Sequence, residues 1–134
     1  MSVIQVAAGL IYRDGRYLIA RRLAGGHLGG FWEFPGGKRE PGESLEGCLA
    51  RELREELNIQ IGHPALFDVV RHAYPEKTVE LHFFHCHIES GEAEAVQCAE
   101  LRWVRPDELT QFQFPPADDV IIGRLCHEAG RSES

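Results

Sequence analysis

Long apolar runs, paired cysteines and an excess of positive charge are all missing from this chain of 134 residues. No apolar segment approaches the roughly 20 residues that a membrane-spanning helix needs, so we expect no membrane partner. The amino-terminal segment lacks the charged start and cleavage site of a signal peptide, which favours a cytoplasmic protein. The four cysteines contain no C-x-x-C pair, so free thiols are expected.

Positive charge is scarce, because 14 Lys and Arg residues face 21 Asp and Glu residues and the net charge is −7. Duplex nucleic acid is held mainly by basic residues that neutralise phosphates, so the composition argues against a long nucleic acid as partner. An acidic protein still binds a small polyphosphate when a divalent cation bridges the two. The position of the carboxylates is therefore the informative feature.

No internal repeat, low-complexity block or linker divides the chain, and its length fits one domain over residues 1–134. The hydrophobic pattern predicts both strands and helices. The predicted strands are Val3–Tyr12, Tyr17–Ala20, Ala65–His72, Thr78–Ile88 and Leu101–Val104; the predicted helices are Ser44–Leu57 and Asp118–Ala129, with a short helical turn at Pro106–Leu109. This order predicts an α/β fold with a mixed sheet covered by helices.

The helix predicted over Ser44–Leu57 carries carboxylates on the side expected to face the interior. Its leucines recur at four-residue spacing and share one sector. Glu52, Glu55 and Glu56 lie within or beside that sector at i, i+3, i+4 spacing, whereas the arginines point away from it. Two carboxylates about 5 Å apart repel by roughly 3 kcal/mol at an effective dielectric near 20. The crowding indicates protonation, cationic partners or a metal, and oxygen ligands suit magnesium.

The segment around this helix resembles the Nudix box, G-x5-E-x7-R-E-U-x-E-E-x-G-U, in which U is aliphatic. Residues 37–59 match every fixed position except the last glycine, which is Asn58. Asparagine tolerates the left-handed conformation that glycine would supply there. The resemblance extends over nearly the whole chain and is closest to the MutT branch of the family. The segments that carry it are Gly9, Arg21-Arg22, His27, Glu33-Phe34-Pro35-Gly36-Gly37-Lys38 and Phe114-Pro115-Pro116-Ala117.

The resemblance implies an α/β/α sandwich with a mixed β-sheet and a hydrolase that depends on magnesium, with manganese as a substitute ion. The best-known members of this branch destroy 8-oxo-dGTP. In the implied reaction, water attacks the phosphate chain of a nucleoside triphosphate, and a nucleoside monophosphate and pyrophosphate leave. The implied magnesium ligands are the Gly36 carbonyl, Glu52, Glu55 and Glu56; Glu43 and Arg51 are implied to brace the loop against the helix.

One departure from the family concerns the catalytic base. Relatives usually place another glutamate before the Leu-Arg-Trp strand, and here Gln97 occupies that position. A glutamine coordinates a metal through its oxygen but takes up no proton at neutral pH. Glu94, Glu100 or a glutamate of the helix are the alternatives, so the base is unassigned. Gln97 also supports a rival function, a Nudix fold that binds nucleotide without cleaving it, although the intact box opposes this.

The MutT likeness also indicates residues that contact the nucleotide. They are Arg22, His27, Glu33, Phe34, Pro35, Gly36, Lys77 and Asp118. Ordinary roles compete with this prediction. Arg22 and Lys77 also suit plain surface cations, and His27 suits a loop residue. Phe34 also suits aromatic core packing.

Asp118 carries the prediction of base preference. The MutT pattern has asparagine at this position, whereas an ionised aspartate only accepts hydrogen bonds. It suits the amino group of cytosine, and Pro-Ala-Asp resembles the CTP and 5-methyl-dCTP pyrophosphohydrolases of the superfamily; it equally suits the N7–H of oxidised guanine. The competing role is a cap on the final helix. We expect 8-oxo-dGTP from the whole-chain likeness, with cytidine triphosphates as the alternative.

Overall fold

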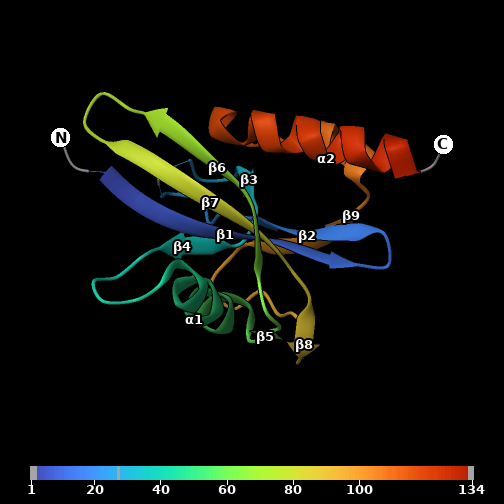
Figure 1. Cartoon of the computed structure of the whole chain (residues 1–134), viewed down its shortest axis with the longest axis horizontal. Coiled ribbons are helices and arrows are strands. Elements are labelled where there is room, and N and C mark those ends of the chain that lie inside the picture. Colours follow the sequence, from blue (N-terminus) through green and yellow to red (C-terminus); the bar gives the residue numbers. More distant parts are fainter. Residues whose placement is uncertain (1–2, 27, 133–134) are drawn as a thin grey trace.

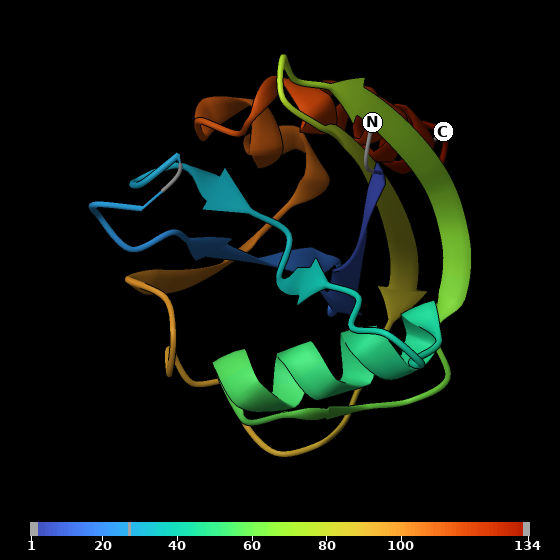
Figure 2. The ribbon, with the colours of Figure 1, turned by 90° about the vertical axis from the view of Figure 1, so that its left-hand side faces the viewer.

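The computed structural model describes residues 3–26 and 28–132 of the chain. A β-sheet forms the middle layer, with helix α1 (Leu45–Leu57) on one face and helix α2 (Asp119–Ser132) on the other (Figure 1). Seen after a turn of 90°, α1 again lies on the opposite side of the strands from the carboxy-terminal segment (Figure 2). The predicted α/β/α sandwich is therefore confirmed. None of the helices in the described ranges is both long and apolar enough to span a membrane.

Strand β1 (Val3–Arg13) organises the sheet. It pairs in parallel with β7 (Thr78–Cys86), and β7 pairs antiparallel with β6 (Ala65–Ala73). On its other edge β1 pairs antiparallel with β4 (Gly36–Lys38). Because the parallel β1–β7 pair lies among antiparallel neighbours, the sheet is mixed, as predicted. Strand β4 was not expected, since its proline-glycine-glycine start is typical of a strand stop.

The far end of β1 joins a second set of strands through a tight hairpin. Asp14 and Gly15 form its turn with φ of 51° and 79°, the left-handed values that such turns require. Strand β2 (Arg16–Arg21) then pairs antiparallel with both β3 (Trp32–Glu33) and β9 (Glu100–Val104). The Asp-Gly pair between the predicted strands Val3–Tyr12 and Tyr17–Ala20 thus forms a hairpin turn.

The strand predicted over Thr78–Ile88 is interrupted at His87. The His87 carbonyl accepts a hydrogen bond from the amide of Gly62 at 3.0 Å. Beyond it the chain leaves β1, and β8 (Ile88–Ser90) pairs antiparallel with β5 (Gln60–Ile61). The change of pairing partner explains why one apolar run gives two strands.

The segment before α2 is wound into two 3₁₀ helices, η1 (Pro106–Gln111) and η2 (Pro116–Asp118). The helical turn predicted within the first of them is confirmed. Helix α2 starts at Asp119, one residue later than predicted, because Asp118 belongs to the 3₁₀ turn. The Asp118 amide donates a hydrogen bond to the Pro115 carbonyl at 3.0 Å.

The sheet divides the hydrophobic core into two clusters. Side chains of successive strand residues point to opposite faces, so Phe83 packs on the α2 side and Phe84 on the α1 side. Leu49, Leu53 and Leu57 of α1 are fully buried in the second cluster and Leu45 is partly buried against it, as the four-residue spacing predicted. The four cysteines are free thiols. Packed side chains therefore cover both faces of the sheet, and the β4 edge is the place left for a binding site.

Candidate active site

Helix α1 begins and ends where the sequence predicted. The Ser44 hydroxyl accepts a hydrogen bond from the Gly47 amide at 3.0 Å, which satisfies one of the free amides of the first turn. Asn58 adopts the left-handed conformation, with φ 56° and ψ 40°, and its amide donates to the Arg54 carbonyl. The departure from glycine at this position leaves the helix end intact.

A guanidinium clamp joins the loop before α1 to the helix. Arg51 donates two hydrogen bonds to Glu43, Nη2 to Oε1 at 2.7 Å and Nε to Oε2 at 3.0 Å, the bidentate geometry that arginine forms with carboxylates. Arg51 also donates to the Lys38 carbonyl of β4 at 3.2 Å. The hydrogen bonds from Arg51, followed by that from the Glu40 amide, lower the pKa of Glu43 to about 2. The clamp thus ties loop, strand and helix together.

The clamp corrects one sequence expectation. The helical pattern pointed Arg51 away from the interior, yet its side chain is only 24% exposed because it reaches over Glu43 and Glu52. Glu55 is 48% exposed and accepts from Arg51 at 3.2 Å, so it lies outside the cavity described below. In the described part of the chain, no three His, Cys, Asp or Glu side chains approach closely enough to hold an ion by themselves. Glu55 as a metal ligand stays a prediction.

Glu52 and Glu56 are the helix carboxylates that face a cavity. Burial, followed by the nearby charges of Glu33 and Glu52, raises the pKa of Glu56 to about 8, while a backbone hydrogen bond from Gly36 opposes the shift. Without a cation, these effects favour the protonated form of the Glu56 carboxyl at neutral pH. A bound dication would supply the charge that keeps it ionised.

Two glycines allow the helix to approach the sheet edge. A Cβ on Gly37 would overlap the Glu52 carboxylate, and a Cβ on Gly36 would overlap the Ala7 carbonyl of β1. No other residue has so little bulk, so this stretch of β4 requires glycine. The close approach brings the Gly36 backbone beside Glu56, where the sequence resemblance had placed a metal-binding carbonyl.

The cavity has a volume of about 410 Å³ and lies at the β4 edge of the sheet, lined by residues of α1 as well as of β1 and β7. One end of the cavity is lined by the two glycines, Glu52 and Glu56. Glu33 and Asp118 also line its wall. Eight of the sequence-predicted site residues line it: Arg22, Glu33, Phe34, Gly36, Glu52, Glu56, Lys77 and Asp118. Residues from β1, β3, β4, α1, β7 and η2 therefore converge on one space.

Asp118 is buried, with 7% of its surface exposed. Burial raises its pKa to about 7, and the charges of Glu33 and Asp119 add to the shift, while Arg22 opposes it. Burial likewise raises the pKa of Glu33, whose carboxylate lies 3.5 Å from Arg22. Among the described residues none donates a hydrogen bond to the Asp118 carboxyl, so the capping role is not supported. This carboxyl is available to a ligand.

The remaining predicted contacts fall in different places. Phe34 lines the cavity and packs edge-to-face on Phe83 at 6.1 Å, so it belongs to the aromatic core and its nucleotide contact stays a prediction. Pro35 is buried outside the cavity lining, and its carbonyl accepts from the Gly9 amide at 2.7 Å; its substrate contact also stays a prediction. His27 lies outside the described residues.

The β6–β7 hairpin forms a rim that the sequence did not indicate. Tyr74 and Lys77 close the turn through paired backbone hydrogen bonds of 2.8 and 3.3 Å. The rings of His72 and Tyr74 meet at 4.6 Å, and both residues line the cavity beside Lys77. His72 and Tyr74 are two residues apart and Lys77 pairs with Tyr74 across the turn, so hairpin spacing is the sequence signal that could have indicated this rim.

The loop that precedes β9 docks on the carboxy-terminal end of α1. The amides of Val96 and Gln97 donate to the Glu56 carbonyl at 3.1 and 3.3 Å. Glu100 instead pairs with Arg102 at 2.8 Å. Neither Glu94, Gln97 nor Glu100 belongs to the cavity lining in the described part of the chain. The catalytic base is thus not supplied by this loop in the observed arrangement.

Comparison with known proteins yields consistent matches. The family model described as NUDIX domain matches residues 6–124. The chain is 38% identical to a CTP pyrophosphohydrolase of Escherichia coli over 122 residues, covering 91% of this chain and 90% of that protein. It is 37% identical to an 8-oxo-dGTP diphosphatase of Haemophilus influenzae over 128 residues, covering 95% and 94%. A MutT crystal structure from Methanosarcina mazei superposes with a TM-score of 0.83 at 26% identity, covering 94% of each chain.

Proposed function

The chain belongs to the Nudix family of hydrolases, and we propose that it cleaves a nucleoside triphosphate to a nucleoside monophosphate and pyrophosphate, with 8-oxo-dGTP as the preferred substrate. One observation carries the proposal. A single cavity holds Glu52 and Glu56 together with Asp118, so groups for a phosphate tail and for a base face the same ligand. We place the reaction in the cytoplasm, where it would remove damaged nucleotides from the pool before they enter DNA.

Magnesium fits the phosphate end. Four carboxyl groups, Glu33, Glu52, Glu56 and Asp118, line the cavity, and their mutual repulsion contributes to the raised pKa of Glu56. Magnesium is usually held by one or two carboxylates plus substrate phosphates, so no third carboxylate is needed. We assign Glu52, Glu56 and the Gly36 carbonyl as its ligands, with manganese as a substitute. When bound, the ion would neutralise phosphate oxygens and lower the pKa of a bound water.

The residues of the chain would supply positioning. The Arg51–Glu43 clamp holds the helix against the loop, so that Glu52 and Glu56 present their oxygens at a fixed place. Arg22 and Lys77 supply positive charge along the cavity wall. Positioning and electrostatic stabilisation account for most catalysis of phosphoryl transfer, which is why a cavity without a nucleophilic serine or cysteine suffices.

Asp118 and Glu33 would read the base. An 8-oxoguanine edge offers several N–H donors, and a buried carboxyl without a protein donor suits such an edge. Phe34 lies in the same wall and offers a flat apolar surface. A wrong base leaves buried polar groups unpaired, so discrimination at this end should be strong. The Haemophilus relative named 8-oxo-dGTP diphosphatase supports this substrate.

The second candidate is a cytidine triphosphate pyrophosphohydrolase, favoured by the Escherichia coli relative of that name. Asp118 also suits the amino group of cytosine. A panel of 8-oxo-dGTP, dGTP, CTP and 5-methyl-dCTP, assayed with magnesium and with manganese, decides between them. A kcat/KM highest for 8-oxo-dGTP supports the proposal, and a maximum at CTP or 5-methyl-dCTP replaces it.

A third candidate is a nucleotide-binding module without hydrolysis, favoured by Gln97 in the place of a glutamate. The same panel tests it. Release of pyrophosphate in the presence of magnesium excludes a pure binding role. Nucleotide binding without pyrophosphate release under any condition of the panel would replace the hydrolase proposal. Long nucleic acids are not expected as substrates, because the net charge is −7.

A further inference from the structure

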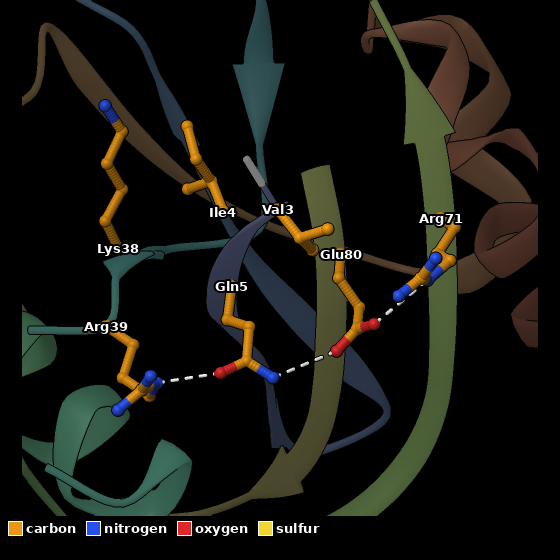
Figure 3. A pocket seen from close by; sticks show the side chains of 7 residues that line it. All are labelled: Val3, Ile4, Gln5, Lys38, Arg39, Arg71 and Glu80. Atoms are coloured by element: carbon orange, nitrogen blue, oxygen red, sulfur yellow. Dashed lines mark hydrogen bonds and ion pairs between the residues drawn. The ribbon is translucent and has the colours of Figure 1, made fainter. Parts of the chain in front are cut away.

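A second hollow, which we call the arginine groove, opens on the α1 side of the sheet near the start of β1. Its volume is about 500 Å³. Gln5 and Glu80 are cross-strand neighbours in β1 and β7, and Arg71 follows in β6, so their side chains share one face. Figure 3 shows the lining residues, which are Val3, Ile4, Gln5, Lys38, Arg39, Arg71 and Glu80.

A chain of hydrogen bonds holds the floor of the groove. Arg39 Nε donates to Gln5 Oε1 at 2.8 Å, and Gln5 Nε2 donates to Glu80 Oε1 at 3.0 Å. Arg71 Nε donates to the other Glu80 oxygen at 3.0 Å (Figure 3). His82 Nε2 lies 2.7 Å from Glu80 Oε1. Both Nε atoms are therefore engaged, and Arg39 Nη1 also donates to the Glu40 and Glu43 carbonyls, which leaves Arg39 Nη2 without a bond to a described residue.

The groove is locally positive in an acidic protein. Arg71 is balanced by Glu80, whereas Arg39 bonds only to the amide oxygen of Gln5 and to the backbone carbonyls of Glu40 and Glu43. Within the described residues, no carboxylate lies within 4 Å of the Arg39 guanidinium. Neither terminal nitrogen of Arg71 is bonded to a described residue. Free guanidinium nitrogens in this arrangement suit a phosphate, which arginine binds through paired N–H groups.

The arginine groove adjoins the nucleotide cavity. Lys38, the last residue of β4, lines both hollows. Its side chain runs beside Ile4 at one margin of the groove (Figure 3). The Glu52 carboxylate lies against Gly37, and Lys38 and Arg39 follow Gly37 along the chain, so the two hollows meet at the end of β4.

Resting on the proposed function, we propose that the arginine groove binds a terminal phosphate group, through Arg39 and Arg71. The group has two sources, the end of a bound nucleoside triphosphate tail and free pyrophosphate after cleavage. The site would favour triphosphates over diphosphates, because only the longer tail reaches past Lys38. Released pyrophosphate would be held there by the same contacts.

Arg71→Gln is the test variant, because Arg71 is 64% exposed and lies outside both the helix and its loop. Arg39 is unsuitable, since it also holds the loop carbonyl of Glu43. Arg16→Gln is the matched control, as it removes the same charge from an exposed position at the start of β2. Arg71→Lys keeps the positive charge but lacks the paired N–H groups of the guanidinium, so it tests whether charge alone restores phosphate binding. All three are compared with the wild-type chain at fixed ionic strength.

The first measurement is steady-state kinetics with a nucleoside triphosphate and its diphosphate. If the tail occupies the groove, Arg71→Gln raises KM for the triphosphate about tenfold, the loss expected for one charge-assisted hydrogen bond to an anion. The KM for the diphosphate and both kcat values should stay at the level of Arg16→Gln. Arg71→Lys should recover part of the loss.

The second measurement is calorimetric titration of the metal-free chain with inorganic pyrophosphate, which requires no turnover. If free pyrophosphate occupies the groove, Arg71→Gln weakens its binding about tenfold relative to Arg16→Gln. A tenfold effect in either measurement supports the site. The measurement that shows it identifies whether the bound phosphate belongs to the triphosphate tail or to free pyrophosphate. Arg71→Gln indistinguishable from Arg16→Gln in both measurements overturns it. If no nucleotide is hydrolysed at all, the proposed function fails, and the titration still decides the groove.

Discussion

The two ends of the cavity, proposed to hold the phosphates and the base of a nucleotide, are assembled in different ways. At the phosphate end, Gly36, Glu52 and Glu56 belong to one continuous stretch of strand, loop and helix. At the base end, Glu33 comes from β3 and Asp118 from η2, which lie far apart in the chain. Local geometry therefore builds the phosphate end, whereas packing of the whole fold builds the base end.

The two ends also differ in the groups that balance the charge of their carboxylates. Glu56 lies among other carboxylates and needs a cation to ionise at neutral pH, since burial and its neighbours raise its pKa to about 8. Asp118, with a pKa raised to about 7, lies beside Arg22 and can meet an N–H donor in either protonation state. Changes at the first end should act on turnover, and changes at the second on the choice of base.

Glu56→Gln should have the largest effect of any single change at the phosphate end. We expect kcat to fall by at least about a hundredfold, the size of loss seen when one group that stabilises transition-state charge is removed. The fold should be retained, because glutamine has the shape of the neutral carboxyl already favoured there. Pyrophosphate release with saturating magnesium measures the effect.

Glu46→Gln is the control for Glu56→Gln, since Glu46 is exposed in the first turn of the same helix and has no assigned role. Near-normal turnover by Glu56→Gln would contradict the ligand assignment.

The pH dependence of stability gives a second test of Glu56. Because the pKa of Glu56 is raised, its contribution to the metal-free protein is present at low pH and is lost as pH rises through about 8. Thermal unfolding of Glu56→Gln should lack this loss.

Arg51→Lys tests the clamp, which shapes the phosphate end without touching the ligand. Lysine keeps the charge but cannot form two parallel hydrogen bonds to Glu43. We expect kcat to fall about tenfold, as misplacement of catalytic groups costs less than their removal. Hydrogen exchange in residues 39–44 should become faster. Arg54→Lys, an exposed position on the same helix, is the control, and equal behaviour of the two variants would count against the clamp.

Much of the phosphate end could be predicted from sequence, because helix periodicity and caps depend on near neighbours. Ser44 and Asn58 bound α1 as expected. The orientation of Arg51 was predicted wrongly, since the helical wheel points it to solvent and ignores the Glu43 carboxylate on the preceding loop. A periodic pattern describes one helix, and the partner that captures a long side chain lies outside it.

The base end was predictable only as single residues drawn from a family resemblance. Nothing in the local sequence shows that Asp118 and Glu33 share a cavity, because the strand pairing that joins β3 to β2 and β1 is a long-range feature. The rim residues His72 and Tyr74 were missed for the same reason. Strand breaks were missed as well, since His87 changes partner through a backbone contact with Gly62.

Asp118→Asn should change the ranking of bases more than the turnover. An amide always offers a donor as well as an acceptor, so the ratio of kcat/KM for 8-oxo-dGTP and CTP should shift about tenfold, as expected when one buried hydrogen bond is mismatched. Asp119→Asn, the exposed neighbour, should leave the ratio unchanged. An unchanged ratio in Asp118→Asn would remove Asp118 from base recognition.

The same variant has a stability signature that depends on pH. The pKa of Asp118 is raised to about 7 by burial, so the folded state favours the protonated form. Its contribution to stability is present below the ordinary aspartate pKa and is lost as pH rises through about 7. The unfolding temperature of the ligand-free wild type should decline over this range. Asp118→Asn should flatten the decline, and a parallel decline in both proteins would contradict the assignment.

Lys77→Gln should have the smallest effect, because Lys77 lies on the hairpin rim where water screens its charge. We expect KM for the triphosphate to rise about twofold to threefold with kcat unchanged, as for a partly exposed ion contact. Glu76→Gln, next to it in the same turn, should leave KM unaltered, and Lys77→Arg should restore it. A fall in kcat would mean that the rim also positions the phosphates. The division between a catalytic end and a binding end would then be wrong.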